Sequence, residues 1–276
     1  MIFYILTGLA VILLLILYGY SQNFFLKTEY YEILAEDVPS PKRLVLLADL
    51  HGNRLGKENE TLLQRIDREK PDAVCVAGDM TVKNGKGAAD MVSLMGRLAG
   101  KYPVYYAPGN HEIRMPQYGD YKEALKKQGV FYLENEWAPL AGGYVIGGLD
   151  LPEFWYHKFW RKRRLKPGQL SKLMDMPGDP AFPILLAHNP EYFPQYAAWG
   201  ARLVLSGHIH GGIARLPFLG GVISPSLRLF PVYDAGLFQE GKCRMVLTRG
   251  LGLHHIKLRF FNRPELSVID MKRENG

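Results

Sequence analysis

The stretch LVLLADLHGN, residues 44–53, joins an apolar run to a carboxylate and an imidazole that lie two positions apart. Leu44 to Ala48 is typical of a strand buried on both faces, because it is a continuous run of apolar residues. Asp49 and His51 follow directly. Since open α/β sheets carry their sites at the carboxyl ends of their strands, this stretch predicts an α/β fold with a polar site at one edge of a sheet.

Four more blocks of the chain repeat this arrangement of an apolar run followed by polar side chains. The runs cover residues 73–77, 104–107, 184–187 and 203–205. The polar residues that follow them are Asp79 in VAGDM, Asn110 and His111 in APGNHE, His188 in LLAHNP, and His208 and His210 in SGHIHGG. Each run is expected to be a buried strand, so the strand ends would bring oxygen and nitrogen ligands into one cleft.

The types of these side chains indicate the chemistry of the site. Carboxylate, imidazole and amide groups together suit divalent ions such as Mn, Fe or Zn, and the absence of cysteine from the set argues against a structural zinc site. One carboxylate can bridge two ions, and two ions about 3.5–4 Å apart clamp the attacking and leaving oxygens of a phosphoryl displacement. A hydroxide between them would be a strong nucleophile at neutral pH, because each ion lowers the pKa of bound water.

The five blocks resemble, in order, the pattern of the calcineurin-like metallophosphoesterase family. That pattern is D-x-H, G-D, G-N-H-[DE], a lone His and G-H-x-H, and the resemblance covers about residues 43 to 270. It implies an α/β fold, a four-layer α/β/β/α sandwich of two mixed sheets. It also implies the activity of a metal-dependent phosphoesterase, in which a metal-bridging hydroxide attacks phosphorus.

The resemblance further implies a role for each residue of the site. Asp49, His51, Asp79 and His210 would hold one divalent ion, and Asp79, Asn110, His188 and His208 would hold the other. His111 is similar to the family's general acid, which protonates the leaving oxygen or steadies the phosphoryl group. A family member that keeps the fold and has lost catalysis is the alternative, but no expected ligand is replaced. His157, His254 and His255 are expected to have no functional role.

The N-terminal segment differs in character from the rest of the chain. Ile2 to Tyr20 has no charged side chain and, at about 1.5 Å per residue, would span about 28 Å, close to the hydrocarbon thickness of a bilayer. A signal peptide is the rival, but no basic residue precedes the run and residues 18–23 make a poor cleavage site. We therefore expect a transmembrane helix over residues 1–20, a polar tether over 21–42 and the phosphoesterase domain over 43–276. Lys27, Lys42 and Arg43 favour a cytoplasmic domain, with the extracellular side as the alternative.

Composition and periodicity agree with a globular α/β domain. The 47% of apolar residues and 12% of aromatic residues allow a full core. The two cysteines, Cys75 and Cys243, indicate small buried residues in strands rather than a disulfide framework. Helices are predicted over residues 59–69, 87–99 and 121–127, and further strands over 144–147, 244–247, 257–261 and 266–269.

A basic, aromatic segment lies between the third and fourth blocks. Six cations between Lys158 and Lys166 contribute +6 to a chain whose formal net charge is +7. The segment could be a solvated face, a surface that binds anionic headgroups or a nucleic-acid site, and the predicted anchor favours the membrane over nucleic acid. The residues expected to meet membrane or substrate are Trp155, Trp160, Arg161, Lys162, Arg163 and Arg164.

The segment after the last block, residues 213–237, is rich in Gly, Pro and apolar residues. It either covers a substrate that has an apolar part or packs over the rim of the sandwich. This stretch also resembles the membrane-anchored branch of the family that includes UDP-2,3-diacylglucosamine pyrophosphatases. The branch has G-H-T-H-G-G-Q, where this chain has Ile209 and Ile213 in place of Thr and Gln.

Together these features predict a membrane-anchored, dinuclear-metal-dependent phosphoric ester hydrolase that acts on a phosphoester, with a lipid-like substrate as one possibility. The alternatives are a UDP-2,3-diacylglucosamine-type pyrophosphatase and a non-catalytic scaffold that docks on the membrane through the basic segment. No nucleic-acid partner is expected.

Overall fold

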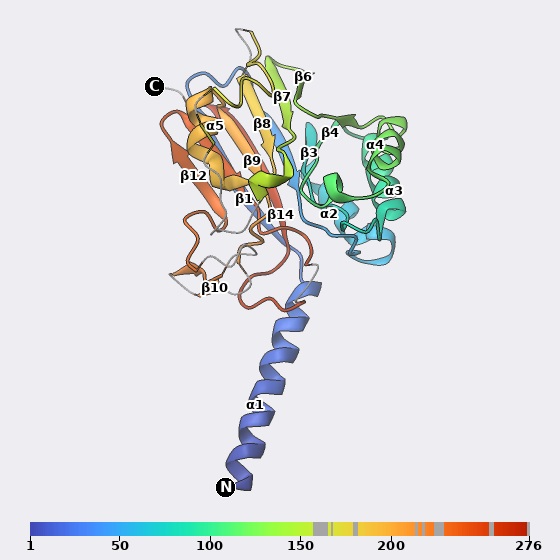
Figure 1. Cartoon of the computed structure of the whole chain (residues 1–276), viewed down its shortest axis with the longest axis vertical. Coiled ribbons are helices and arrows are strands. Elements are labelled where there is room, and N and C mark those ends of the chain that lie inside the picture. The colour runs from blue at the N-terminus through green and yellow to red at the C-terminus, as the bar shows by residue number, and fades with distance from the viewer. Residues whose placement is uncertain are drawn as a thin grey trace.

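Two six-stranded mixed sheets face each other in the computed structural model, which describes residues 1–156, 165–166, 168–178, 182–212, 215–216, 219–223, 229–253 and 257–274 (Figure 1). The first sheet has the order β1 (Lys27–Ala35), β14 (Glu265–Arg273), β2 (Lys42–Leu47), β3 (Ala73–Ala77), β4 (Val104–Ala107) and β5 (Phe131–Tyr132). The second has the order β12 (Gly236–Glu240), β13 (Cys243–Leu247), β9 (Leu203–Ser206), β8 (Phe182–Ala187), β7 (Tyr144–Leu149) and β6 (Glu136–Leu140).

Helices cover the outer faces of the two sheets, which confirms the predicted four-layer sandwich. The helices are α2 (Glu60–Glu69), α3 (Ala88–Ala99) and α4 (Tyr118–Lys127) on the first sheet and α5 (Phe193–Trp199) on the second. Strand β2 shows why its sequence is apolar throughout. Leu44 and Leu46 point into the core between the sheets, whereas Val45 and Leu47 pack under the helices.

The predicted elements agree with the structure at most positions. The five apolar runs are strands β2, β3, β4, β8 and β9, and the three predicted helices are α2, α3 and α4. Strands also occur where 144–147, 244–247 and 266–269 predicted them, as β7, β13 and β14. The strand predicted over 257–261 is wrong, because this segment is an irregular loop organised around the buried side chain of Arg259.

The expectation of a polar tether over residues 21–42 is also corrected. Strand β1 occupies much of that segment and pairs in parallel with β14 over its whole length. Because Ser267 of β14 pairs with both Glu29 and Leu46, the start of β1 lies beside the carboxyl end of β2. The end of the sheet that carries Asp49 is therefore the end at which the N-terminal helix joins the domain.

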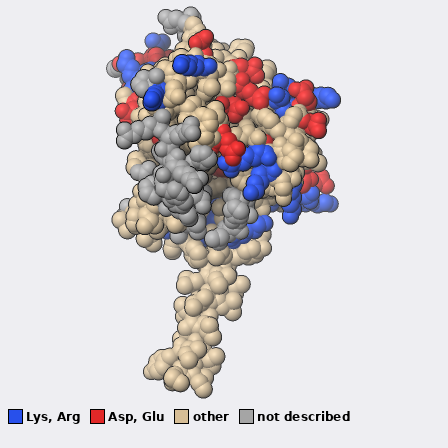
Figure 2. All heavy atoms as spheres, in the orientation of Figure 1, with Lys and Arg blue, Asp and Glu red and all other residues tan. Residues whose placement is uncertain are grey.

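Helix α1 (Ile2–Ser21) stands away from the sandwich with most of its side chains exposed (Figure 1). Together with the short 3-10 helix η1 (Gln22–Phe24), it is long and apolar enough to cross a membrane, judged by length and composition. Figure 2 shows it as an uncharged column, whereas the charged side chains of this view lie on the domain. Its last turn contacts the domain. The backbone N–H of Arg259 donates a hydrogen bond to the Gly19 carbonyl at 2.9 Å.

Candidate metal centre

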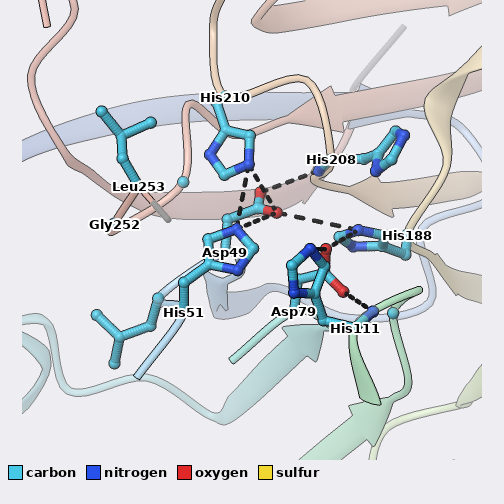
Figure 3. A network of polar contacts seen from close by, with 12 residues as sticks. Asp49, His51, Asp79, His111, His188, His208, His210, Gly252 and Leu253 are labelled. Carbon is cyan, nitrogen blue, oxygen red and sulfur yellow. Dashed lines mark hydrogen bonds and ion pairs between the residues drawn. The ribbon is translucent and has the colours of Figure 1, made fainter. Parts of the chain in front are cut away.

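The first part of the centre is built around Asp49, directly after β2 (Figure 3). Asp49 is fully buried, and its Oδ2 accepts the backbone N–H of His208 at 2.9 Å. Its Oδ1 has no hydrogen-bond partner among the described residues. The Nε2 atoms of His210, His51 and His188 lie 3.6, 3.8 and 3.9 Å from this oxygen. A buried carboxylate oxygen ringed by imidazole nitrogens at such distances is the donor set that a cation requires.

Two of the histidines that face each other in this group come from opposite sheets. His51 follows β2 and His210 follows β9, and their Nε2 atoms are 3.2 Å apart. Asp49, His51 and His210 each offer one ligand atom within 4.8 Å of the other two. This group corresponds to three of the four residues expected for the first ion.

Asp79, after β3, forms the second part of the centre with His188 and His208. The Oδ2 atom of Asp79 lies 3.0 Å from Nε2 of His188, and the three residues again offer ligand atoms within 4.8 Å of one another. The Nδ1 atom of His188 donates to the Ala77 carbonyl at 2.6 Å, because a carbonyl can only accept. That bond fixes the ring and turns Nε2 toward the centre, as is usual for histidine ligands of metals.

Asn110 completes the set expected for the second ion. Its side chain is buried, and its Oδ1 has no hydrogen-bond partner in the part of the chain that the structure describes. A buried amide oxygen without a donor is costly, and a cation at the centre would remove that cost.

His111 lies at the edge of the same centre, where it, His51 and Asp79 offer ligand atoms within 4.8 Å of one another. Its backbone N–H donates to Oδ1 of Asp79 at 2.7 Å, and its Nδ1 accepts the backbone N–H of Lys83 at 3.2 Å. Since Nδ1 is an acceptor, the neutral ring carries its proton on Nε2. That atom lies 4.0 Å from Oδ2 of Asp79, so the proton faces the centre.

Burial and mutual contact shift the pKa values of these groups. Burial raises the pKa of Asp49 to about 7 and lowers the pKa of His208 to about 3. Burial opposes charge on Asp79 as well, but His188 outweighs it and holds the pKa of Asp79 well below its usual value. Burial likewise opposes charge on His188, yet Asp79 raises the pKa of that ring to about 9. Asp79 is therefore an anion beside a protonated His188. A cation bound at the centre would replace the proton on His188.

Five of the ligand candidates share a backbone conformation that side chains seldom adopt. Asp49, His51, Asp79, His208 and His210 have φ angles between 52° and 75°. Each such residue costs on the order of 1–3 kcal/mol, and strain of this kind clusters at functional sites. The strained turns direct side chains from three strand ends toward one point.

Glu112 supports the centre, although its sequence position did not predict this role. Its buried carboxylate accepts backbone N–H groups of Asp79, Met80, Thr81 and Gly109 and the hydroxyl of Tyr106. It therefore ties the loop after β3 to the loop after β4. The only signal in the sequence is its place in the GNHE block, because its partners are almost all main-chain groups.

Arg259 and Asn262 support the other side of the centre and were missed for the same reason. The buried guanidinium of Arg259 donates to the carbonyls of Arg249, Gly250, Gly252 and Asn262. The Asn262 amide donates to the carbonyls of His210 at 2.7 Å and Gly212 at 2.6 Å. This segment thereby fixes the loop that carries His210.

The structure brings the seven Asp and His residues of the predicted centre together in overlapping groups, and Asn110 lies next to His111 in the chain. It describes little of the basic segment. Trp160, Arg161, Lys162, Arg163 and Arg164 lie outside the described residues, as do His157, His254, His255 and Ile213. Trp155 is only 5% exposed, and its carbonyl accepts the side-chain amide of Asn189. Trp155 is thus a core residue, which corrects its place in the predicted membrane patch.

Comparison with known proteins gives a family and several relatives. The family profile described as Calcineurin-like phosphoesterase matches residues 42–212. Uncharacterized metallophosphoesterase YkuE of Bacillus subtilis (strain 168) is 29% identical over 78% of this chain and 73% of its own. Phosphodiesterase YaeI of Escherichia coli (strain K12) is 26% identical over 92% and 93%. A transmembrane protein with metallophosphoesterase domain from Danio rerio is 27% identical over 88% of this chain and 56% of its own.

Proposed function

Because the chain belongs to the calcineurin-like phosphoesterase family, we propose that it hydrolyses phosphoric esters with the help of two divalent metal ions. The observation that carries the proposal is the position of Asp49 Oδ1, buried without a donor among the described residues and 3.6–3.9 Å from three imidazole nitrogens. Ligand atoms that share one ion at about 2.0–2.2 Å lie roughly 3–3.6 Å apart. The cluster is therefore slightly wider than a loaded site and needs only small movements to close.

The residues of the chain divide naturally between two ions. Asp49, His51 and His210 would hold one, and His188, His208 and Asn110 the other, with Asp79 between them. Mn, Fe and Zn all accept such a mixture of carboxylate, imidazole and amide ligands. When bound, the ions supply an activated water and neutralise charge on the phosphoryl oxygens.

His111 would supply a hydrogen-bond donor to the reacting phosphoryl group. Its Nε2–H faces the centre, and the Lys83 backbone N–H keeps the ring in that tautomer. A neutral ring in this tautomer would donate a hydrogen bond to a phosphoryl or leaving oxygen and stabilise the negative charge that develops there as the ester bond breaks. Because Asp79 accepts the His111 backbone N–H at 2.7 Å, this hydrogen-bond donor is held at a fixed position relative to the proposed metal ligand.

We also propose that helix α1 anchors the enzyme in a membrane, with the catalytic domain on the cytoplasmic side. The helix is apolar over its whole length, and a relative from Danio rerio is described as a transmembrane protein. Lys27, Lys42 and Arg43 follow the helix, which favours the cytoplasmic side. The metal centre lies at the end of the sandwich nearest to α1, and this favours a lipid-linked phosphoester such as a UDP-diacylglucosamine-type pyrophosphate.

The full chain, purified in detergent, should be assayed against a phosphomonoester, a phosphodiester and a nucleotide–lipid pyrophosphate, each with Mn and with a chelator. We expect metal-dependent hydrolysis of at least one of these esters and its loss in Asp79→Ala. Hydrolysis that chelation and Asp79→Ala both leave unchanged would contradict the proposed function.

A further inference from the structure

Exposed apolar side chains gather at the end of the domain where helix α1 joins it. Phe24 is 67% exposed, Leu219 66% and Phe261 60%. Contiguous apolar surface of this kind marks a contact with a protein or a membrane. We call this surface the root patch, and it comprises Phe24, Phe25, Leu216, Leu219, Val232 and Phe261.

The root patch is continuous with the foot of the helix. The ring of Phe261 lies 5.9 Å from that of Tyr18, and the guanidinium of Arg263 lies 5.4 Å above the ring of Phe25. Leu216, Leu219, Val232 and Phe261 line one open pocket of about 570 Å³. Three separate segments therefore contribute side chains to this pocket, and Phe261 joins the pocket to the foot of the helix.

Hydrogen bonds fix this surface relative to the helix axis. The Gly19 carbonyl accepts the backbone N–H of Arg259, the Asn23 amide donates to the Lys257 carbonyl at 2.9 Å, and Arg263 Nε donates to Gln22 Oε1 at 2.9 Å. Gly19 also packs closely, since a Cβ there would lie 2.8 Å from the Phe260 ring. These contacts hold the root patch in a fixed orientation relative to the axis of helix α1.

We propose that the root patch lies in the headgroup region of the bilayer that helix α1 crosses, so that the metal centre is held at the membrane surface. The proposal rests on the anchor role proposed above for α1. A helix of 20 residues is about 30 Å long and fills the hydrocarbon layer, which places Gln22 to Phe25 at its boundary. Aromatic side chains favour that boundary.

The charged side chains that line the pocket of the root patch are paired with each other or with neighbours. Arg215 beside the patch already pairs with Asp234 at 3.0 Å, and Arg249 pairs with Glu29 at 3.2 Å. Arg215 and Arg249 are therefore largely neutralised, and the part of the docking that this pocket contributes should change little with salt, because screening acts on charges. This distinguishes the root patch from the predicted basic segment.

The root patch and the metal centre share one supporting segment. Phe261 follows Arg259, which holds the carbonyl of Gly252 at 2.8 Å. The backbone N–H of Gly252 in turn donates to the carbonyl of Asp49 at 2.7 Å. A bilayer against the root patch would consequently lie next to the ligand loops, where a membrane-borne phosphoester can reach them.

The test uses the full chain in nanodiscs of phosphatidylethanolamine and phosphatidylglycerol. The photoreactive residue benzoylphenylalanine replaces Phe261 or Leu219 in the root patch, Leu14 within the helix, or Leu34 as the control. Leu34 is an exposed apolar residue seven positions along β1 from Lys27, about 23 Å farther from the helix. Mass spectrometry after illumination then identifies what each position has captured.

We expect lipid adducts at positions 261, 219 and 14 and none at 34, at low and at high salt. Adducts at 14 but not at 261 or 219 would overturn the root patch and leave the anchor intact. Failure at position 14 would overturn the anchor role itself, and capture of a second copy of the chain at 261 or 219 would identify the patch as a protein interface instead.

Discussion

The Nε2 atoms of His51 and His210 lie 3.2 Å apart, although the two residues are 159 positions apart in the chain and follow strands of different sheets. Burial and the neighbouring His51 hold the pKa of His210 well below its usual value, so its ring is neutral. Two imidazole nitrogens that face each other beside a carboxylate provide a ligand set for a divalent ion. Side chains from both sheets of the sandwich therefore meet at the metal centre.

His111→Ala should lower turnover by about 10²–10³-fold, because the variant loses the Nε2–H group that would stabilise charge on the reacting phosphoryl oxygens. Metal content should stay near that of the wild type, since His111 is not among the ligands proposed for either ion. Steady-state kinetics and elemental analysis on one preparation check both points. Loss of the ions in this variant would show that His111 is a ligand, and full turnover would remove its role.

Glu112→Gln should destabilise the fold by about 3 kcal/mol or more. The Glu112 carboxylate accepts five hydrogen bonds, and the glutamine amide would place its NH₂ group opposite some of those donors. Tyr106→Phe is the matched control, since it removes one of those bonds and leaves the carboxylate; it should cost about 1 kcal/mol. Denaturant unfolding measures both values. Equal and small effects would mean that Glu112 does not organise the two loops.

Asn262→Ala should weaken metal binding by about 10–100-fold without removing any ligand, as is typical when a group that orients a ligand is lost. The reason is that Asn262 fixes the His210 carbonyl and with it the His210 loop. Asn135→Ala, at a turn that supports Asp150, is the control and should leave metal affinity unchanged. Both variants are freed of metal with a chelator and then titrated with Mn to measure their affinity for the ion. The same affinity for both would refute the support role of Asn262.

Asp150→Asn should stabilise the protein at neutral pH. Burial, aided by Glu134, raises the pKa of Asp150 to about 6 in the folded state. A raised carboxyl pKa means that the folded state prefers the neutral form, so the wild type loses stability as the pH rises from about 4 to about 6. The variant avoids this loss and should gain about 1–2 kcal/mol above pH 7, after allowance for solvent screening. Denaturant unfolding at several pH values should show the gain vanish near pH 4.

The sequence predicted the parts of the fold that are buried on both faces. Strands β2, β3, β4, β8 and β9 are continuous apolar runs, and the polar groups after them could be assigned to one centre because parallel strands end at the same edge. Strand β1 was missed because it is an edge strand whose side chains are mostly at least partly exposed, so Lys27 to Ala35 has no continuous apolar run and resembled a tether.

The supporting residues were beyond prediction for a different physical reason. The hydrogen-bond partners of these residues, Glu112, Arg259 and Asn262, are almost all backbone groups. Because nearly every residue has a backbone N–H and a carbonyl, the residue types do not show which of them a side chain will bind. Trp155 was misassigned because an aromatic next to a basic run fits a membrane surface and a core equally well, and only the packed structure distinguishes them.

The metal content of the full chain tests the central claim most directly. Protein reconstituted with Mn and freed of excess ion should contain about two ions per chain, and Asp79→Ala should lose most of both, because Asp79 lies between the two groups of ligands. Elemental analysis that finds no metal in the wild type after reconstitution, or the same content in Asp79→Ala, would contradict the assignment of this cluster as a two-metal centre.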